Sequence, residues 1–223
     1  DLIASSTPIG MWKAWSPQHS LESMDAGGTQ KAVLSMTVPQ INYSSNEQAR
    51  SLSRDANEFA AKLRSDYPGR FGFFGALPFP DVDGSLAEIA YALDVLKSDG
   101  IGMFTSYGKS YLGDDVFKPV FEELNRRRAI VFVHPTSPSC CTNVIPSLYD
   151  ADIEYGTDTT RAIARMVFSG STVRYPNIRF IWSHAGGTMP YLQGRFERES
   201  DTPQSKKANL PHAFIGEARK MYY

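Results

Sequence analysis

Two histidines stand at the carboxyl ends of two apolar segments of the chain. His134 follows residues 129–133 and precedes Pro135, and His184 follows residues 178–182 just before a pair of glycines. If these segments are neighbouring parallel strands, their ends lie roughly 5 Å apart. Two imidazoles at that distance can bind one metal ion, and barrel enzymes place their chemistry at this edge. The pattern therefore predicts a metal site formed by His134 and His184.

The elements that must position these histidines alternate along the chain from about residue 30. Short apolar or β-branched runs predict strands at 31–38, 71–77, 101–105, 129–133 and 178–182. Amphipathic runs between them predict helices at 44–65, 85–100, 116–128 and 157–168, with further helices from 189 and 210. A strand is expected to open again at 221–223. Such alternation predicts a parallel sheet covered by helices.

Polar residues mark the expected helix ends. Ser44 and Ser85 are each followed three residues later by a glutamate, which predicts two capping boxes. Thr157 or Asp158 is expected to cap the helix after the long loop, and Gly100 to end the second helix.

Both an open doubly wound sheet and a (β/α)8 barrel fit this order of elements. The sequence has no G-x-G-x-x-G after its first strand and no G-x-x-x-x-G-K-[ST], so the usual nucleotide-binding reasons for an open sheet are missing. A TIM barrel typically needs about 250 residues, and the chain has 223. We therefore expect residues 1–223 to form a single, incomplete (β/α)8 barrel domain.

Composition narrows the possible partners. The net charge of −1 gives no basic surplus for nucleic acid or for an anionic membrane. No apolar run approaches the roughly 20 residues that span a bilayer. The two cysteines, Cys140 and Cys141, are adjacent, and adjacent cysteines rarely pair without strain. We expect reduced thiols and a cytoplasmic protein.

The residues at the expected strand ends resemble those of a known family. The matching blocks are Phe-Phe-Gly-Ala-Leu-Pro at 73–78, Asp-Gly-Ile-Gly at 99–102, Tyr-Leu-Gly at 111–113, Val-His-Pro-Thr at 133–136 and Ser-His-Ala-Gly-Gly-Thr-Met-Pro-Tyr-Leu at 183–192. They resemble the second amidohydrolase family of metal-dependent barrels. This family includes aminocarboxymuconate-semialdehyde decarboxylase and the aromatic acid decarboxylases, and the likeness is greatest to the fungal 6-methylsalicylate decarboxylases. It covers residues 12–223.

The resemblance implies non-oxidative decarboxylation of an ortho-hydroxy aromatic acid of the salicylate, 6-methylsalicylate or resorcylate type. Such an enzyme is a carbon–carbon lyase whose divalent metal holds the carboxylate and the phenolic oxygen. Zinc is expected as the metal, with manganese or magnesium as alternatives. His134 is implied as a metal ligand, and His184 as a ligand or a catalytic, proton-handling residue. The family also implies a homodimer or homotetramer.

Two of the family's ligand-bearing strands have no counterpart in the sequence. The family's first strand supplies His-x-His or Glu-x-His, and a late strand supplies an aspartate, but neither is found here. The resemblance therefore predicts a barrel without its first and last strands, truncated at both ends. A hydrolase of the same family and an inactive truncated homologue are the alternative functions.

Four further residues are candidates for substrate binding. Trp15 can form an aromatic wall over a benzoate ring or simply cover one end of the barrel. Phe74, Leu77 and Thr105 end strands and are expected to line the pocket. The Gly186–Gly187 pair is expected to form a tight turn, and its missing Cβ atoms can also let substrate or metal approach the backbone; the two roles can hold together.

Overall fold

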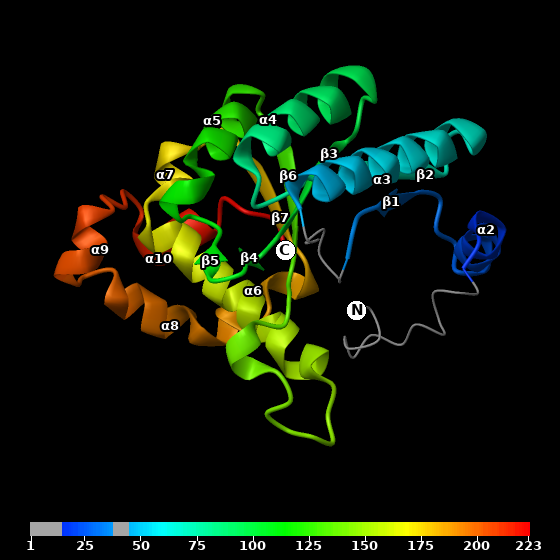
Figure 1. The fold of residues 1–223 in the computed structure, drawn as a ribbon. Helices are drawn as coiled ribbons and strands as arrows, with labels where there is room; N and C mark the ends of the chain where they lie inside the picture. Colours follow the sequence, from blue (N-terminus) through cyan, green and yellow to red (C-terminus); the bar gives the residue numbers. More distant parts are fainter. Residues whose placement is uncertain (1–14, 38–44) are drawn as a thin grey trace. The chain divides into compact units, whose positions relative to one another are not determined.

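The chain divides into two compact units, Asp1–Gly102 and Met103–Tyr223, called here the first and second unit. The computed structural model describes residues 15–37 and 45–223 (Figure 1). Strands and helices alternate in both units, as the sequence predicts.

The first unit places helices beside short parallel strands. Strands β1 (Ala32–Leu34) and β2 (Phe71–Gly75) pair in parallel, and β2 pairs in the same direction with the start of β3 (Gly100–Phe104). The helices of this unit are α2 (Pro17–Ala26), α3 (Asn46–Asp66) and α4 (Val82–Ala90), the last continued by a π-helical turn over Tyr91–Val95. The predicted strands at 31–38 and 71–77 are confirmed with shorter bounds, residue 38 lying outside the described residues, and the strand predicted at 101–105 is confirmed one residue earlier.

The helix ends of the first unit differ from the predicted ones. Ser45 caps α3 by accepting from the Gln48 amide, whereas the predicted cap, Ser44, lies outside the described residues. Asp81 caps α4, so Ser85 falls inside the helix and is buried. Asp81 is favoured because its carboxylate also binds a guanidinium of α3. Gly100 begins β3 instead of ending a helix.

A buried asparagine fixes the carboxyl end of β2. The Asn57 side chain of α3 donates to the Ala76 carbonyl at 3.0 Å and accepts from the Ala76 amide at 2.7 Å. A side-chain amide can do both at once, so it replaces a strand partner where β2 ends. A separate apolar cluster of Leu21, Met24, Leu63 and Phe71 packs α2 and α3 against β2. Helix α3 therefore fixes the backbone of Ala76, the residue before Leu77.

The second unit is built around strands β6 (Ile130–His134) and β7 (Arg179–Trp182), which pair in parallel. Tyr222 forms one isolated parallel bridge to Ile181, where the sequence predicts a strand to open at 221–223; the structure assigns a single bridge there and no strand. The short strands β4 (Ser106–Tyr107) and β5 (Ser110–Tyr111) form an antiparallel hairpin that the sequence did not predict. The helices of this unit are α5 (Lys118–Arg126), α6 (Asp150–Phe168), α7 (Ser171–Arg174), α8 (Met189–Glu199), α9 (Pro203–Lys207) and α10 (Ala213–Ala218).

The strand pair is anchored by alternating buried side chains. Val131 and Val133 of β6 pair with Phe180 and Trp182 of β7, and all four side chains are buried. Full burial of an aliphatic or phenylalanine side chain contributes about 1.5–3 kcal/mol. A shift of one residue would turn these side chains to the other face, so the register is well determined. It aligns the carboxyl ends of the two strands.

Helix α6 is longer than predicted and begins at Asp150 instead of 157. The Asp150 carboxylate accepts from the Asn143 amide, and acidic residues suit the first turn of a helix. Thr157 and Asp158 therefore lie inside the helix and do not cap it. This correction matters because Asp158 becomes a buried residue.

The Cys140 and Cys141 sulfurs are joined in a disulfide within the 3-10 turn Ser139–Cys141. The expectation of reduced thiols is therefore wrong for this structure, because the turn brings neighbouring side chains together. Among the described residues, the helices are too short or too polar to cross a membrane.

Candidate active site

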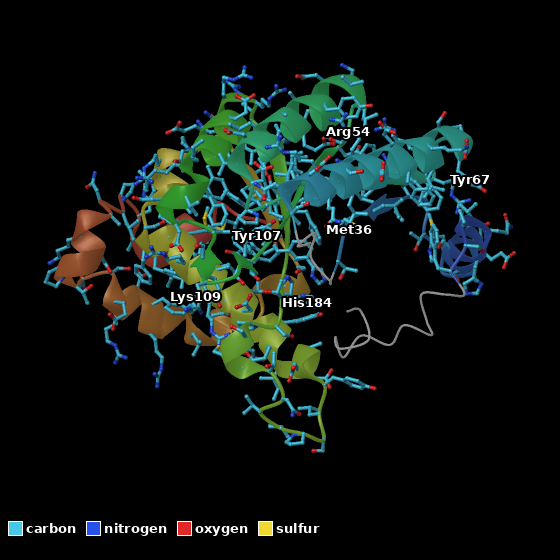
Figure 2. The ribbon with its side chains drawn as sticks, in the orientation of Figure 1. Met36, Arg54, Tyr67, Tyr107, Lys109 and His184 are labelled. Carbon is cyan, nitrogen blue, oxygen red and sulfur yellow. A yellow bond between two sulfur atoms is a disulfide. The ribbon has the colours of Figure 1, made fainter. Side chains whose placement is uncertain are left out.

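The two predicted histidines lie together at the carboxyl ends of β6 and β7. Their ring centroids are 5.7 Å apart and the ring planes are inclined by 71°. His134 is the last residue of β6, and the amide of Ser183, one residue before His184, donates to the Val133 carbonyl at 3.2 Å. Figure 2 shows His184 in the turn that follows β7. The strand positions were predicted correctly, while the metal-binding role stays a prediction.

The His134 ring has a defined tautomer. Its Nδ1 lies 2.8 Å from the Pro135 carbonyl oxygen, and a carbonyl only accepts, so Nδ1 carries the proton. In the neutral ring, Nε2 then has the lone pair. Burial lowers the pKa of His134, the nearby His184 lowers it further, and the Pro135 hydrogen bond opposes both. The ring is therefore neutral at neutral pH, as a metal ligand must be.

His184 lies in an unusual turn. Residues 184–187 all have positive φ, with values of 54° at His184 and 51° at Ala185. The Gly187 amide donates to the His184 carbonyl at 2.9 Å and closes the turn. The His184 Nδ1 lies 3.1 Å from the Ser183 hydroxyl, which can donate or accept. The left-handed run directs the chain from β7 into α8.

Gly187 has no side chain because α6 occupies that space. A Cβ at Gly187 would lie 2.0 Å from the Gly156 carbonyl oxygen and 3.0 Å from its Cα. The Thr188 amide also donates to the Thr160 hydroxyl at 2.9 Å. The tight-turn interpretation is therefore confirmed at Gly187. The backbone of α6 fills the space of the missing Cβ at Gly187, and the approach of substrate or metal to the backbone of the glycine pair stays a prediction.

Tyr155 was not predicted from the sequence, yet its ring completes a cluster with the two histidines. Its centroid lies 5.6 Å from that of His134 and 5.9 Å from that of His184. Tyr155 precedes Gly156 in α6, so the close packing of Gly156 on Gly187 brings the tyrosine to the site. Burial raises the pKa of the Tyr155 phenol, which is protonated at neutral pH. We call these residues the three-ring cluster.

A hydrogen-bonded network surrounds the fully buried carboxylate of Asp158, which follows Tyr155 by three residues in α6. The Thr105 and Tyr111 hydroxyls donate to it, and the Thr136 hydroxyl lies 3.4 Å away. Thr105 was predicted to bind substrate. Because its hydroxyl proton is committed to Asp158, direct substrate contact stays a prediction and its observed role is within this network.

The other predicted substrate-binding residues belong to the first unit. Phe74 lies in β2 opposite Gly100, and Leu77 is buried just after β2. Trp15 precedes α2, where its indole nitrogen donates to the Ser20 hydroxyl at 2.9 Å and its ring meets the Phe59 edge. Their roles toward a substrate stay predictions.

The donor set for a metal is partial in the described residues. No group of three or more histidine, cysteine, aspartate or glutamate side chains in 15–37 and 45–223 is arranged to hold an ion. The two imidazoles fit a divalent metal in chemistry, since His134 is neutral and its Nδ1 proton is held by a backbone oxygen, an arrangement typical of metal-binding histidines. His134 and His184 can therefore each supply one nitrogen ligand to the same metal ion.

Comparison with protein families places these elements in a known group. The sequence profile of the amidohydrolase family matches residues 7–205. A decarboxylase of Aspergillus niger (yanB) is 38% identical over 220 residues, covering 94% of this chain and 60% of the relative. A 6-methylsalicylic acid decarboxylase of Penicillium expansum is 40% identical over 164 residues, covering 72% of this chain and 51% of the relative. The chain thus spans less than two thirds of the length of these relatives.

Solved structures show the same fold. A crystal structure titled as an amidohydrolase II has a TM-score of 0.85 and 25% identity, covering 93% of this chain and 66% of that one. A 5-carboxyvanillate decarboxylase of Novosphingobium aromaticivorans, solved with bound manganese, has a TM-score of 0.74 and 26% identity, covering 83% of this chain and 57% of that one. The predicted fold class, an incomplete barrel of the metal-dependent hydrolase type, is confirmed.

Proposed function

This chain belongs to the amidohydrolase family, and on that premise we propose that it acts as a metal-dependent, non-oxidative decarboxylase of an ortho-hydroxy aromatic acid. The enzyme class is a carbon–carbon lyase. The substrate is of the salicylate, 6-methylsalicylate or resorcylate type. The observation that carries the proposal is the pairing of His134 and His184, 5.7 Å apart, at the ends of adjacent strands. One relative named as a decarboxylase and another named as a 6-methylsalicylic acid decarboxylase support it.

We propose that His134, through Nε2, holds the metal, and that His184 is either its second ligand or the residue that handles the proton of the reaction. Zinc suits imidazole ligands, and the manganese in a related decarboxylase makes manganese the main alternative, before magnesium. When bound, a divalent ion supplies a positive charge for the carboxylate and phenolic oxygens of the substrate. The Pro135 carbonyl keeps the His134 ring in the orientation that this role needs.

The residues of the three-ring cluster have separate proposed tasks. Decarboxylation requires a proton at the ring carbon that bears the carboxylate before the carbon–carbon bond breaks. Where His184 is not a metal ligand, we assign it to handle this proton, because the adjacent Ser183 hydroxyl can either donate to or accept from its Nδ1. Tyr155 stays protonated and places an apolar ring edge beside both imidazoles. Trp15, Phe74, Leu77 and Thr105 remain proposed substrate-binding residues.

We also propose a homodimer or homotetramer in the cytoplasm that binds neither nucleic acid nor membranes. Support for self-association comes from large apolar side chains exposed together around the start of α6, namely Val144, Ile145, Leu148, Tyr149 and Ile153. Contiguous exposed apolar side chains often mark interfaces. Analytical ultracentrifugation over a range of concentrations tests the oligomeric state.

The decisive experiment supplies purified protein with Zn²⁺, Mn²⁺ or Mg²⁺ and offers salicylate, 6-methylsalicylate and 2,6-dihydroxybenzoate, with 4-hydroxybenzoate as the matched control. Released carbon dioxide and the phenolic product are measured together. We expect metal-dependent release from the ortho-hydroxy acids only. Equal rates with 4-hydroxybenzoate, or no release from any acid with each metal, would contradict the proposal. Cleavage of an ester or amide panel instead would favour a hydrolase.

A further inference from the structure

Asp158 is a carboxylate buried in the interior of the second unit, where packing alone would be served by an apolar side chain. Its side chain is 0% exposed within α6, and its carboxylate accepts hydroxyl hydrogen bonds from Thr105 and Tyr111. The Arg161 guanidinium, one turn later, approaches Oδ1 at 3.7 Å. Burying a carboxylate costs several kcal/mol before compensation, and an apolar residue would often stabilise the fold as well. A buried carboxylate is therefore expected to do something that an apolar residue cannot.

The carboxylate controls the direction of the Thr105 hydroxyl. A hydroxyl has one hydrogen and two lone pairs. Because the hydrogen points to Asp158, a lone pair is left for the Thr136 amide, which donates to Thr105 Oγ1 at 3.2 Å. The Thr105 amide in turn donates to the His134 carbonyl at 3.0 Å. Thr105 thus joins the carboxylate to the backbone on both sides of Pro135.

One peptide group connects Thr105 to the ring of His134. The Thr136 amide and the Pro135 carbonyl are the two ends of the same planar unit, so fixing one end fixes the other. The Pro135 oxygen accepts the Nδ1 proton of His134 at 2.8 Å. The Thr136 hydroxyl, 3.1 Å from Ser106 and 3.4 Å from Asp158, restrains the same segment from its side chain.

We propose that Asp158 is a positioning residue that keeps the His134 proton on Nδ1, acting through the Thr105 hydroxyl and the peptide group between Pro135 and Thr136. The importance of Asp158 for metal binding rests on the proposed function of His134 as a metal ligand. The tautomer itself does not, because it is a property of the protein without metal or substrate.

A second buried carboxylate provides the matched control. Glu217 of α10 is also 0% exposed, and it accepts from a threonine hydroxyl, that of Thr172, at 2.9 Å and from Lys220 at 2.7 Å. These contacts do not involve β6 or the three-ring cluster. Asp158→Asn and Glu217→Gln therefore remove one buried negative charge each with similar changes in shape.

The test measures the ring ¹⁵N chemical shifts of His134 in metal-free protein, at a pH where the ring is neutral, with His134→Ala used for assignment. We expect one Nδ1–H tautomer in the wild type and in Glu217→Gln. In Asp158→Asn we expect a mixture with the Nε2–H form. Asparagine keeps only one acceptor oxygen for the Thr105 and Tyr111 hydroxyls, so the Thr105 hydroxyl and the Thr136 amide bonded to it lose their fixed direction. Zn²⁺ affinity should fall about 10- to 100-fold in Asp158→Asn. An unchanged tautomer with Zn²⁺ affinity within about twofold of the wild type would overturn the proposal.

A second pair of variants covers the possibility that Asp158→Asn does not fold. Thr105→Val keeps the shape but removes the hydroxyl, whereas Thr105→Ser keeps the hydroxyl. The valine variant should show the mixture of His134 tautomers, and the serine variant should show the single wild-type tautomer. Identical ¹⁵N spectra of the valine and serine variants would refute the proposed action through the Thr105 hydroxyl. A protein inactive toward every acid but with these tautomer shifts would refute the proposed function alone.

Discussion

The Gly156 carbonyl oxygen lies where a side chain on Gly187 would begin, 2.0 Å from an ideal Cβ. This contact presses the turn after β7 onto α6. It sets the 5.9 Å distance between the His184 and Tyr155 rings. Gly156 and Gly187 thus meet at this contact, but a methyl group would have much less space on Gly187 than on Gly156.

Gly187→Ala should strongly destabilise the protein. Gly187 has φ of 66° and ψ of −132°, which a residue with a Cβ adopts at a cost of about 1–3 kcal/mol. Overpacking against Gly156 adds about 1–3 kcal/mol. Urea unfolding followed by circular dichroism should show a clearly lower midpoint.

Gly156→Ala is the matched control for that contact. A Cβ at Gly156 would meet the Gly187 Cα at 3.7 Å, an ordinary van der Waals distance. Alanine favours a helix by about 1 kcal/mol over glycine, so the variant should be as stable as the wild type or more so. Equal losses in both variants would contradict the asymmetry described.

His134→Ala should abolish tight metal binding and nearly all decarboxylation. The change removes a proposed ligand and its backbone-held proton together. Metal content after dialysis, measured by plasma mass spectrometry, should fall in parallel with turnover. His19→Ala changes an exposed histidine of α2 and should leave both measurements unaltered. Full metal occupancy with normal turnover in His134→Ala would show that the ligand assignment is wrong.

For Tyr155 we expect the ring to matter more than the hydroxyl. Tyr155→Phe preserves both ring contacts and should keep kcat/KM within about threefold. Tyr155→Ala leaves the histidine rings unsupported, and misplacement of reacting groups by about 1 Å can cost about 10²-fold. Steady-state kinetics on the best substrate decides the matter. A phenylalanine variant as impaired as the alanine variant would instead assign chemistry to the phenol.

Asp81 should make stability depend on pH in the acid range. The hydrogen bond from Arg50, aided by the Gly84 amide, holds the pKa of Asp81 below its usual range although burial opposes this. The stabilisation is therefore fully present above the unfolded pKa of about 3.9, and it is lost as pH falls through the lower folded value. Asp81→Asn, which can still cap α4, should lower the free energy of unfolding at pH 7 but hardly at the lowest pH at which the fold persists.

Asp55→Asn changes an exposed aspartate of α3 and serves as the control for Asp81. Its effect should stay within about 0.5 kcal/mol at either pH. Chemical unfolding at both pH values measures this. A loss in Asp81→Asn that is equal at both would show that the charge is not responsible.

The sequence was informative where local signals determine structure. Apolar runs that end in Pro135 or in the glycine pair predicted β6 and β7, and hence the meeting of His134 and His184. The start of α6 was missed because the segment before Gly156 has exposed apolar residues and no helical periodicity.

Contacts distant in sequence account for most other misses. The α4 cap depends on Arg50, 31 residues away from Asp81. Tyr155 reaches the histidines only through packing between Gly156 and Gly187. The residue type of Asp158 predicts a helix cap. Only its burial and its hydrogen bond with Thr105 indicate that it belongs to a buried network instead. No local pattern contains such information.

The left-handed run at 184–187 also bears on ligand binding. Since the fold fixes these backbone torsions, His184 loses its backbone freedom during folding and little remains to be lost on complex formation. The turn therefore makes His184 a contact whose backbone is ordered before a ligand arrives, so that this part of the cost of complex formation falls on folding.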